Sequence, residues 1–211
     1  MPLRFTKIAI FLAALIPLER LLWKAFHDGL GANPIEVITH STGDWTLIFV
    51  LTTLSITPLR QITRQYWLIG VRRMIGLFAF FYATLHFLTY IWLDKFFDVH
   101  EMAKDVVKRP FITVGFAAFV LLIPLALTST AWSIRRLGGR NWRRLHRLIY
   151  LTGILGVTHY TWLVKADRHK PIEYGIVLAI LLSYRVVIWT HEKIYAERRP
   201  VPVRNPAVTK V

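Results

Sequence analysis

The sequence contains no cysteine among its 211 residues. Without thiols the chain forms no disulfide, no thiolate metal site, no cysteine-ligated iron–sulfur cluster and no covalent link to a c-type haem. It also has no Gly-rich nucleotide loop of the G-x-G-x-x-G kind. Any nucleotide-binding step connected with its function is therefore expected to reside on a separate protein.

Acidic residues are scarce, with 12 Asp+Glu against 27 Lys+Arg, and the formal net charge is +15. Hydrophobic residues make up 55% of the chain and the mean hydropathy is +0.43. This composition is too apolar for a disordered chain. A strongly basic chain is typical of proteins that bind nucleic acid or a membrane, and the positions of the charges distinguish between the two.

Six long apolar stretches follow one another along the chain. Most reach the roughly 20 residues that a helix needs to cross about 30 Å of hydrocarbon, and the second reaches that length only with its polar flanks. Because a helix satisfies its own backbone hydrogen bonds in lipid, we predict an all-α bundle of six transmembrane helices. The stretches are Ile8–Phe26, Trp45–Leu59, Met74–Leu93, Phe111–Trp132, His146–Val164 and Ile172–Thr190.

The connections between these stretches alternate in charge. The two termini, the second-to-third connection and the fourth-to-fifth connection together hold 17 Lys and Arg but only two acidic residues, whereas the other connections hold seven basic and nine acidic residues. The positive-inside rule then predicts both termini in the cytoplasm. Most of the charge is explained by topology and lipid contact, and nucleic acid is not an expected partner. We expect one membrane domain over residues 1–211, with a short basic cytoplasmic tail at 191–211.

Two of the eight histidines fall at the same depth of the predicted bundle. His86 is 12 residues past Met74 and His159 is 13 residues past His146, so both lie about 18–20 Å from the inner edge of helices that run in the same direction. Facing histidines on two helices of a bundle are typical of bis-imidazole haem ligation. Hydrogen bonding between helices and a proton path are the alternatives.

His146 and His159 do not lie on the same face of a helix, because 13 residues at 100° each place their side chains about 140° apart around the helix axis. At the corresponding depth of the third stretch the sequence has Arg72 and Arg73, so a second haem would lack its obvious partner. His146 is a candidate haem ligand, a candidate contact to a propionate or another redox cofactor, or an interfacial histidine in a basic loop.

Two charged clusters have both a functional and a structural interpretation. Arginines at the inner face match the oxyanions of propionates, flavin phosphate or anionic lipid, or they only set topology; they are Arg72, Arg73, Arg143, Arg144 and Arg147. An outer acidic loop steers docking of a partner, or it is simply solvated; it contains Asp94, Asp98, Glu101 and Asp105.

Several segments resemble a known family. The strings RRMIGLFAFFYATLHFLTY (72–90), RPFITVG (109–115), ALTST (126–130) and WRRLHRLIYLTGILGVTHYTW (142–162) are similar to those of MsrQ, the family of membrane haem subunits of bacterial periplasmic methionine sulfoxide reductase systems. GLGANP (29–34) and LSITPLR (54–60) agree as well. The likeness covers nearly the whole chain and places it in the ferric-reductase-like transmembrane group.

The resemblance implies b-type haem bound by histidines of the third and fifth helices, at positions matched here by His86, His146 and His159. It also implies an FMN, electrons from the quinone pool or a cytoplasmic flavin reductase, and a periplasmic molybdopterin partner that reduces methionine sulfoxide. Larger relatives carry a second histidine in the region that Arg72 and Arg73 occupy here, and this difference disfavours a two-haem path across the membrane.

We therefore expect a multi-pass protein of the bacterial inner membrane that passes electrons outward for the repair of oxidised periplasmic proteins. A six-coordinate haem has no open position, which favours electron transfer over oxygen activation. The chain would be the electron-transfer subunit of an oxidoreductase complex and would not itself reduce methionine sulfoxide. The alternatives are a partner-dependent ferric reductase and a six-helix transporter whose histidines, Glu19 and Arg20 carry protons or ions.

Overall fold

The computed structural model describes residues 3–166 and 168–197, and this part of the chain is helical, without strands. The elements are α1 (Leu3–Phe26), α2 (Pro34–Thr63), α3 (Leu68–Leu88) with its π-helical continuation η1 (Thr89–Asp94), α4 (Val99–Lys108), α5 (Pro110–Leu127), α6 (Ala131–Leu137), α7 (Gly139–Leu145), α8 (Leu148–Leu163) and α9 (His169–Glu197). The prediction of an all-α protein is confirmed.

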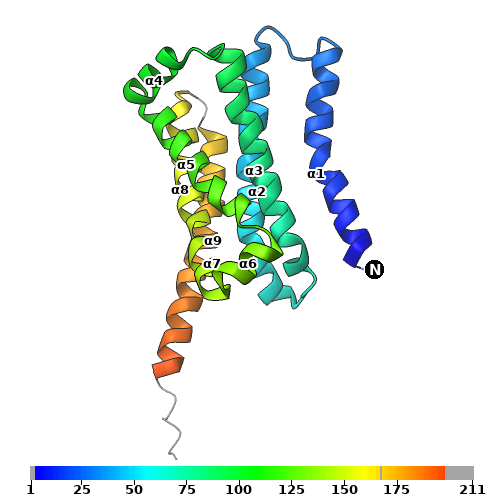
Figure 1. Cartoon of the computed structure of the whole chain (residues 1–211), viewed down its shortest axis with the longest axis vertical. Coiled ribbons are helices and arrows are strands. Elements are labelled where there is room, and N and C mark those ends of the chain that lie inside the picture. The colour runs from blue at the N-terminus through cyan, green and yellow to red at the C-terminus, as the bar shows by residue number, and fades with distance from the viewer. Residues whose placement is uncertain (1–2, 167, 198–211) are drawn as a thin grey trace, which may run out of the picture.

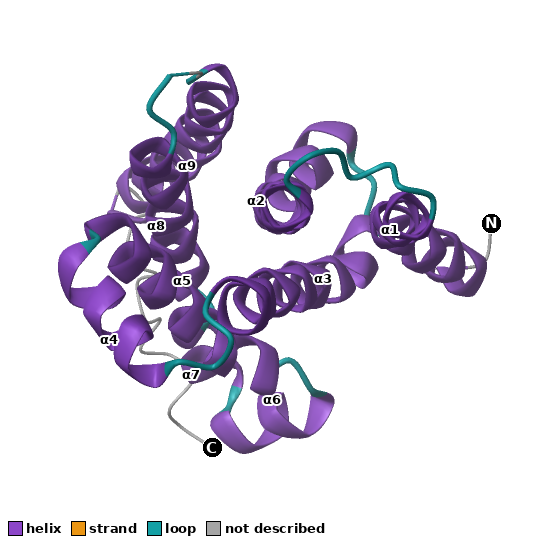
Figure 2. Cartoon of the chain, turned by 90° about the horizontal axis from the view of Figure 1, so that it is seen from above, coloured by secondary structure: helices purple, strands orange, loops and turns teal. Residues whose placement is uncertain are grey.

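The long helices run between two ends of the molecule (Figure 1). One end, called the α4 end, holds α4 and the α1–α2 and α8–α9 connections. The opposite end, called the α7 end, holds α6, α7, the start of α1 and the α2–α3 connection. Seen from above, α1 lies on one side of α3, and α5 and α8 lie on the other (Figure 2). The connections thus alternate between the ends in the predicted order.

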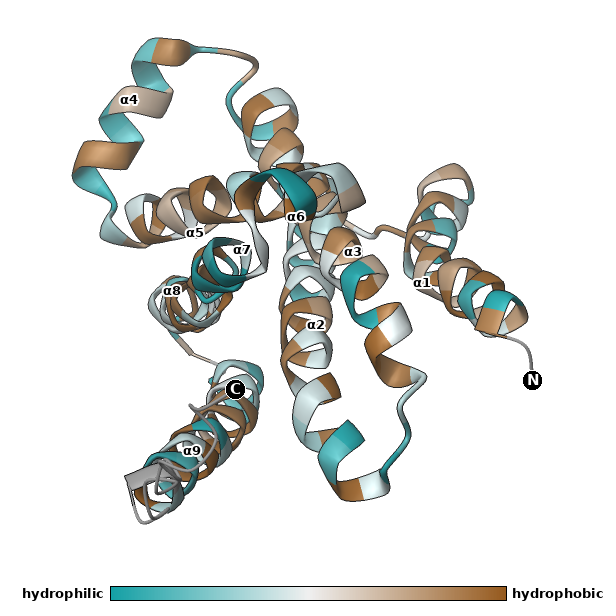
Figure 3. Ribbon diagram, turned by 60° about the horizontal axis from the view of Figure 1, so that its bottom comes forward, coloured by the Kyte–Doolittle hydropathy of each residue, from teal (hydrophilic) through white to brown (hydrophobic). Residues whose placement is uncertain are grey.

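Four helical segments within the described residues are long and apolar enough to cross a membrane, namely Pro34–Thr63, Leu68–Asp94, Pro110–Leu127 and His169–Tyr195. Helix α8 has 16 residues and falls short of this length. Helix α1 has 24 residues but contains Pro17 and several charged residues, Glu19 and Arg20 among them. Four of the six predicted spans therefore meet the requirements of length and composition. Figure 3 shows the difference in hydropathy between the largely apolar α5 and the hydrophilic α7.

Helix α2 begins eleven residues before the apolar stretch that predicted it. Asn33 caps the helix by accepting from the backbone N–H of Glu36 at 3.4 Å, and Pro34 occupies the first turn. His40 and Asp44, which precede the predicted stretch Trp45–Leu59, are therefore helical residues. The prediction was wrong here because a capping residue, rather than the end of an apolar run, decides where a helix begins.

The two charged connections contain helices that hydropathy did not predict. Asp98 caps α4 by accepting from the backbone N–H of Glu101 at 3.0 Å. Thr130 caps α6 in the same way through Ser133, and Gly138, with φ +75°, separates α6 from α7. The fifth stretch is correspondingly shorter, because His146 ends α7 and α8 begins at Leu148. The sixth predicted stretch ends at Thr190, whereas α9 continues to Glu197. Residues 198–211 lie outside the described residues.

The most extensive packing joins α2 to α3 and α5 to α8. The ring of Phe49 on α2 stacks on Phe78 and Tyr82 of α3, with centroids 5.6 and 5.3 Å apart. Tyr82 is 1% exposed. Its hydroxyl donates to the Ala14 carbonyl at 2.9 Å and accepts from the Leu18 backbone N–H at 3.2 Å. Pro17 interrupts the hydrogen-bond ladder of α1 at this turn, and the tyrosine attaches the interrupted turn to the core.

Candidate functional site

A cavity of about 600 Å³ lies between α2, α3 with η1, α4, α5 and α8. Its wall is mainly apolar, with side chains such as Val50, Phe87, Phe116 and Leu122. Helix α4 contributes Met102 and Val106, so the cavity is at the α4 end of the bundle. A largely apolar pocket with a few convergent polar groups is the usual form of a cofactor site.

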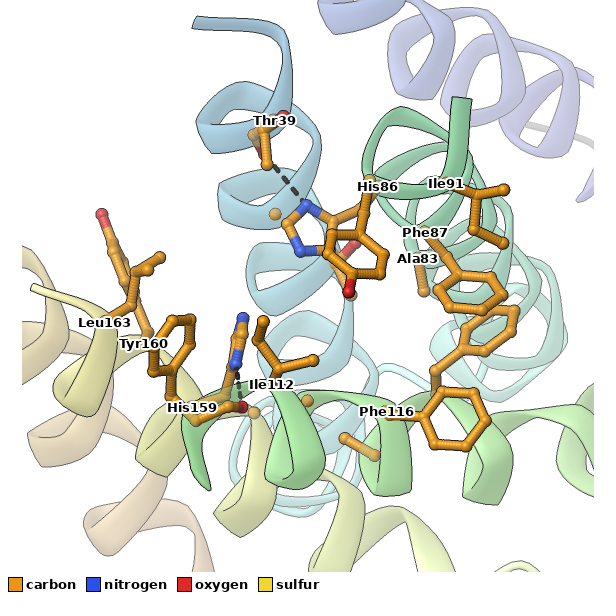
Figure 4. A pocket seen from close by; sticks show the side chains of 18 of the residues that line it. Thr39, Ala83, His86, Phe87, Ile91, Ile112, Phe116, His159, Tyr160 and Leu163 are labelled. Carbon is orange, nitrogen blue, oxygen red and sulfur yellow. Dashed lines mark hydrogen bonds between the residues drawn. The ribbon is translucent and has the colours of Figure 1, made fainter. Parts of the chain in front are cut away.

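The polar groups that meet in this cavity include His86 of α3 and His159 of α8. Their ring centroids are 6.1 Å apart and their planes cross at 77°. The structure therefore brings together the two histidines that the sequence placed at one depth, from helices separated by more than 70 positions in the chain. Figure 4 shows the second nitrogen of each ring turned toward the space between the rings.

Each imidazole is held by a backbone carbonyl. Nδ1 of His86 lies 3.0 Å from the Thr39 carbonyl oxygen of α2, and Nδ1 of His159 lies 2.7 Å from the Phe111 carbonyl oxygen of α5. A carbonyl only accepts, so each Nδ1 donates its proton and each Nε2 keeps a lone pair. This is the arrangement in which a hydrogen bond behind the ring orients a metal-ligating imidazole.

Two glycines leave room for these rings. A Cβ on Gly43 of α2 would be 3.1 Å from Cε1 of His86, and a Cβ on Gly115 of α5 would be 2.6 Å from Nδ1 of His159. Sequence reasoning assigned no role to either glycine or to the Thr39 and Phe111 carbonyls. The string RPFITVG, which carried the resemblance, contains both Phe111 and Gly115, but its residues gave no indication of which ring they would meet.

His146 lies apart from the pair and does not line the cavity. Its ring stacks on Trp142, with centroids 3.8 Å apart, and its Nε2 is 3.0 Å from the hydroxyl of Thr128. That hydroxyl donates its single hydrogen to the Pro124 carbonyl at 2.6 Å, so it accepts from Nε2–H, and the lone pair of His146 is on Nδ1. His146 therefore belongs to a separate polar cluster at the α7 end.

A buried ion pair fastens α4 over the cavity. Asp105 is 5% exposed, and its carboxylate forms ion pairs with Lys95 at 2.6 Å and with Arg109 at 3.3 Å and accepts from the Tyr90 hydroxyl at 3.3 Å. The hydrogen bond from Lys95 lowers the pKa of the Asp105 carboxyl and the same bond raises the pKa of Lys95. We call these four residues the α4 latch.

Most acidic residues of the loop suggested for docking have a partner within the chain. Asp105 belongs to the α4 latch, Asp98 caps α4, and Glu101 pairs with Lys104 at 2.9 Å. At the cavity rim, Asp44 pairs with Lys170 of α9 at 2.8 Å. Among the inner-face arginines, Arg72 is half-buried, whereas Arg73, Arg143, Arg144 and Arg147 are exposed.

Comparison with known proteins identifies the family of the chain. The model of the family described as "Ferric reductase like transmembrane component" matches residues 41–157. A relative from Herminiimonas arsenicoxydans is 58% identical, over 90% of this chain and 88% of its own. Relatives from Ralstonia nicotianae and Bordetella pertussis are 54% and 52% identical, each over 87% of this chain and over 86% and 89% of their own lengths.

All three relatives are named as the haem-binding subunit MsrQ of a protein-methionine-sulfoxide reductase. The matched region contains most of α2, all of α3 to α7 and the larger part of α8. The chain is a multi-pass inner-membrane protein that belongs to the ferric-reductase-like transmembrane family and, within it, to the MsrQ group.

Proposed function

We propose that this chain is a b-type cytochrome subunit whose haem iron is held between Nε2 of His86 and Nε2 of His159. The observation that carries the proposal is the 6.1 Å separation of the two ring centroids. Two metal–imidazole bonds of about 2 Å each, with roughly 1 Å from each nitrogen to its ring centre, also give about 6 Å. The apolar wall and the two free lone pairs fit the same group.

The residues around His86 and His159 orient the two rings and leave space for a haem. The Thr39 and Phe111 carbonyls fix the proton on each Nδ1 and orient each Nε2. Gly43 and Gly115 leave room for the rings close to α2 and α5. The apolar side chains exclude water, and α4 closes the cavity at its end. When bound, the haem would supply a one-electron redox centre.

We propose the full six-span topology, with α1 and α8 as the remaining spans and both termini in the cytoplasm. The basic residues support it, because the connections rich in arginine all lie at the α7 end. The His86–His159 pair then lies toward the periplasm. The tail at 191–211 remains a predicted cytoplasmic extension, of which the structure describes the continuation of α9 to Glu197.

In this orientation electrons enter from the quinone pool or a cytoplasmic flavin reductase, with FMN as a second cofactor. They leave at the α4 end to a periplasmic molybdopterin-containing subunit that reduces methionine sulfoxide. The names of the relatives support the partnership with a methionine sulfoxide reductase. His146, in the polar cluster at the α7 end, is the proposed cofactor residue nearest the site of electron entry, and its Nδ1 is the nitrogen available for contact.

A spectrum of purified protein tests the haem ligands. We expect a reduced-minus-oxidised haem b spectrum in wild-type protein, and at least a tenfold loss of haem per chain in His86→Ala and in His159→Ala. The exposed His100 is the matched control, and His100→Ala should retain full haem. Normal haem content in either of the first two variants would show the assignment to be wrong.

The description of the matched family makes ferric reductase activity the second candidate. Reoxidation of the reduced protein separates the two functions. Rapid reoxidation by ferric citrate alone supports a ferric reductase. Slow reoxidation by ferric citrate, with fast reoxidation by a periplasmic methionine sulfoxide reductase and its substrate, supports the electron-transfer subunit.

A further inference from the structure

Arg185 of α9 reaches into the bundle instead of snorkelling to its surface. Its Nη1 donates to the Tyr150 hydroxyl at 2.8 Å, its Nη2 donates to the Leu54 carbonyl at 2.8 Å, and the guanidinium lies 4.9 Å from the centre of the Tyr150 ring. Leu54 is fully buried, and its carbonyl has no helical donor because position 58, four residues on, is a proline. The backbone of α2 thus presents an acceptor to the arginine.

One atom of Arg185 has no partner. Among the buried side-chain nitrogen and oxygen atoms of the described residues, Nε of Arg185 is the one without a hydrogen bond. A buried donor without an acceptor costs roughly 1–3 kcal/mol, and more for a charged group. Arg185 is therefore held by hydrogen bonds from Nη1 and Nη2, while its Nε–H lacks an acceptor.

Arg72 of α3 approaches the same part of α2. Its Nη1 donates to the hydroxyl of Thr57 at 3.3 Å, and Thr57 is three residues from Leu54. No salt bridge within the described residues includes Arg72, Arg185 or Arg60. Arg72 and Arg185 therefore both donate to the Leu54–Thr57 turn of α2, and neither has a carboxylate partner within the described residues.

Like charges that meet inside a membrane protein are costly unless an anion lies between them. Guanidinium groups bind phosphate with paired N–H donors, and a phosphate offers several oxygens to donors that come from different helices. Neither Arg72 nor Arg185 lines the cavity of the histidine pair, so an anion here would occupy a different site.

We propose that Arg72 and Arg185 bind one phosphate group at the α7 end of the bundle, against the Leu54–Thr57 turn of α2. The unpaired Nε of Arg185 and the remaining N–H groups of Arg72 are the donors. The phosphate belongs either to the headgroup of an anionic phospholipid or to the phosphate ester of a soluble cofactor. The site is independent of the haem assignment.

Phosphorus analysis of the full chain tests the proposal. The protein is washed extensively in phosphate-free detergent and buffer, digested, and assayed for total phosphorus per chain. We expect about one tightly held phosphorus in wild-type protein and at least a tenfold loss in Arg72→Gln and Arg185→Gln. Arg73→Gln is the control, because Arg73 is the neighbouring residue, has the same charge and is exposed. Extraction into chloroform then separates a phospholipid source from a water-soluble one.

A second measurement keeps the test valid if Arg185→Gln does not fold. The thermal midpoint of washed wild-type protein is measured with dioctanoyl-phosphatidylglycerol, with FMN, and with dioctanoylglycerol and riboflavin as phosphate-free controls. We expect a rise with one phosphate-bearing probe, no rise with its phosphate-free counterpart, and no response in Arg72→Gln. The proposal is overturned if washed wild-type protein holds no phosphorus and no probe stabilises it. It is also overturned if Arg73→Gln loses phosphorus as fully as Arg72→Gln.

Discussion

Gly115 lies so close to His159 that a Cβ at this position would be 2.6 Å from the ring nitrogen Nδ1. The ring is held there by its 2.7 Å hydrogen bond to the Phe111 carbonyl, one turn earlier on the same helix. Helix α5 therefore supplies both the acceptor that orients the imidazole and, at Gly115, the space that the ring occupies. The position of the His159 ring therefore depends on the absence of a side chain at residue 115.

Gly115→Ala is expected to displace the His159 ring. The added methyl cannot coexist with the present ring position, and overpacking of this kind costs about 1–3 kcal/mol. We expect haem content to fall at least fivefold under the proposed function, together with a lower thermal midpoint. Gly76→Ala is the matched control, because its Cβ would be 3.6 Å from Thr53, and alanine favours a helix by up to about 1 kcal/mol. Full haem retention in Gly115→Ala would contradict the packing argument.

Tyr82→Phe is expected to loosen α1. The substitution removes the hydroxyl that joins the Ala14 carbonyl and the Leu18 N–H at the Pro17 turn, so two hydrogen bonds between α1 and α3 are lost. The expected cost is about 1–3 kcal/mol. Hydrogen exchange of 13–19 should quicken by at least tenfold while exchange in α2 and α3 stays unchanged. Tyr66→Phe, at an exposed position, should change nothing; equal exchange in the two variants would refute the role of Tyr82.

Asp105→Asn is expected to release α4. The change leaves Lys95, with a side chain 14% exposed, without its buried counter-charge, and breaking a buried pair costs roughly 3 kcal/mol. Protease cleavage within 95–110 should become at least tenfold faster. Glu101→Gln removes the exposed pair with Lys104 on the same helix, which contributes less than about 1 kcal/mol, and should leave the cleavage rate unchanged.

The α4 latch also predicts a pH dependence. The pKa of Asp105 is lowered in the folded protein, so its stabilisation is present above the ordinary carboxyl pKa of about 3.9 and is lost as the pH falls through the folded value. The pKa of Lys95 is raised, so its stabilisation is present below about 10.4 and is lost as the pH rises through the folded value. Protection of α4 against proteolysis should therefore be flat between these limits, and a steep change near neutral pH would contradict this account.

The histidine pair shows how far sequence reasoning reaches. Equal depth on two helices that run in the same direction follows from counting residues, and His86 and His159 indeed meet. Their acceptors do not follow from counting, because the Thr39 and Phe111 carbonyls are backbone atoms whose identity depends on how four helices pack. Gly115 was likewise visible in the sequence, but its role exists only once α5 lies against α8.

The connections were less predictable than the spans, for a physical reason. Hydropathy detects what is buried in lipid, so α4 was taken for an acidic loop although Asp98 is a typical helix cap. The same limitation placed Asp44 outside α2 and His146 inside the fifth helix. In each case local capping and turn residues, and not the length of an apolar run, set the boundary.

The contact between Arg185 and the Leu54 carbonyl has a genetic consequence. A backbone acceptor cannot be removed by changing the residue that carries it, so substitutions at Leu54 leave the oxygen in place. The residue that exposes this oxygen is Pro58, because any other amino acid there restores an N–H donor to the helix. The codon for residue 58 therefore decides whether the Leu54 carbonyl is free to accept from Arg185, and exchange of this proline for any other residue would introduce an N–H that competes with the arginine for that oxygen.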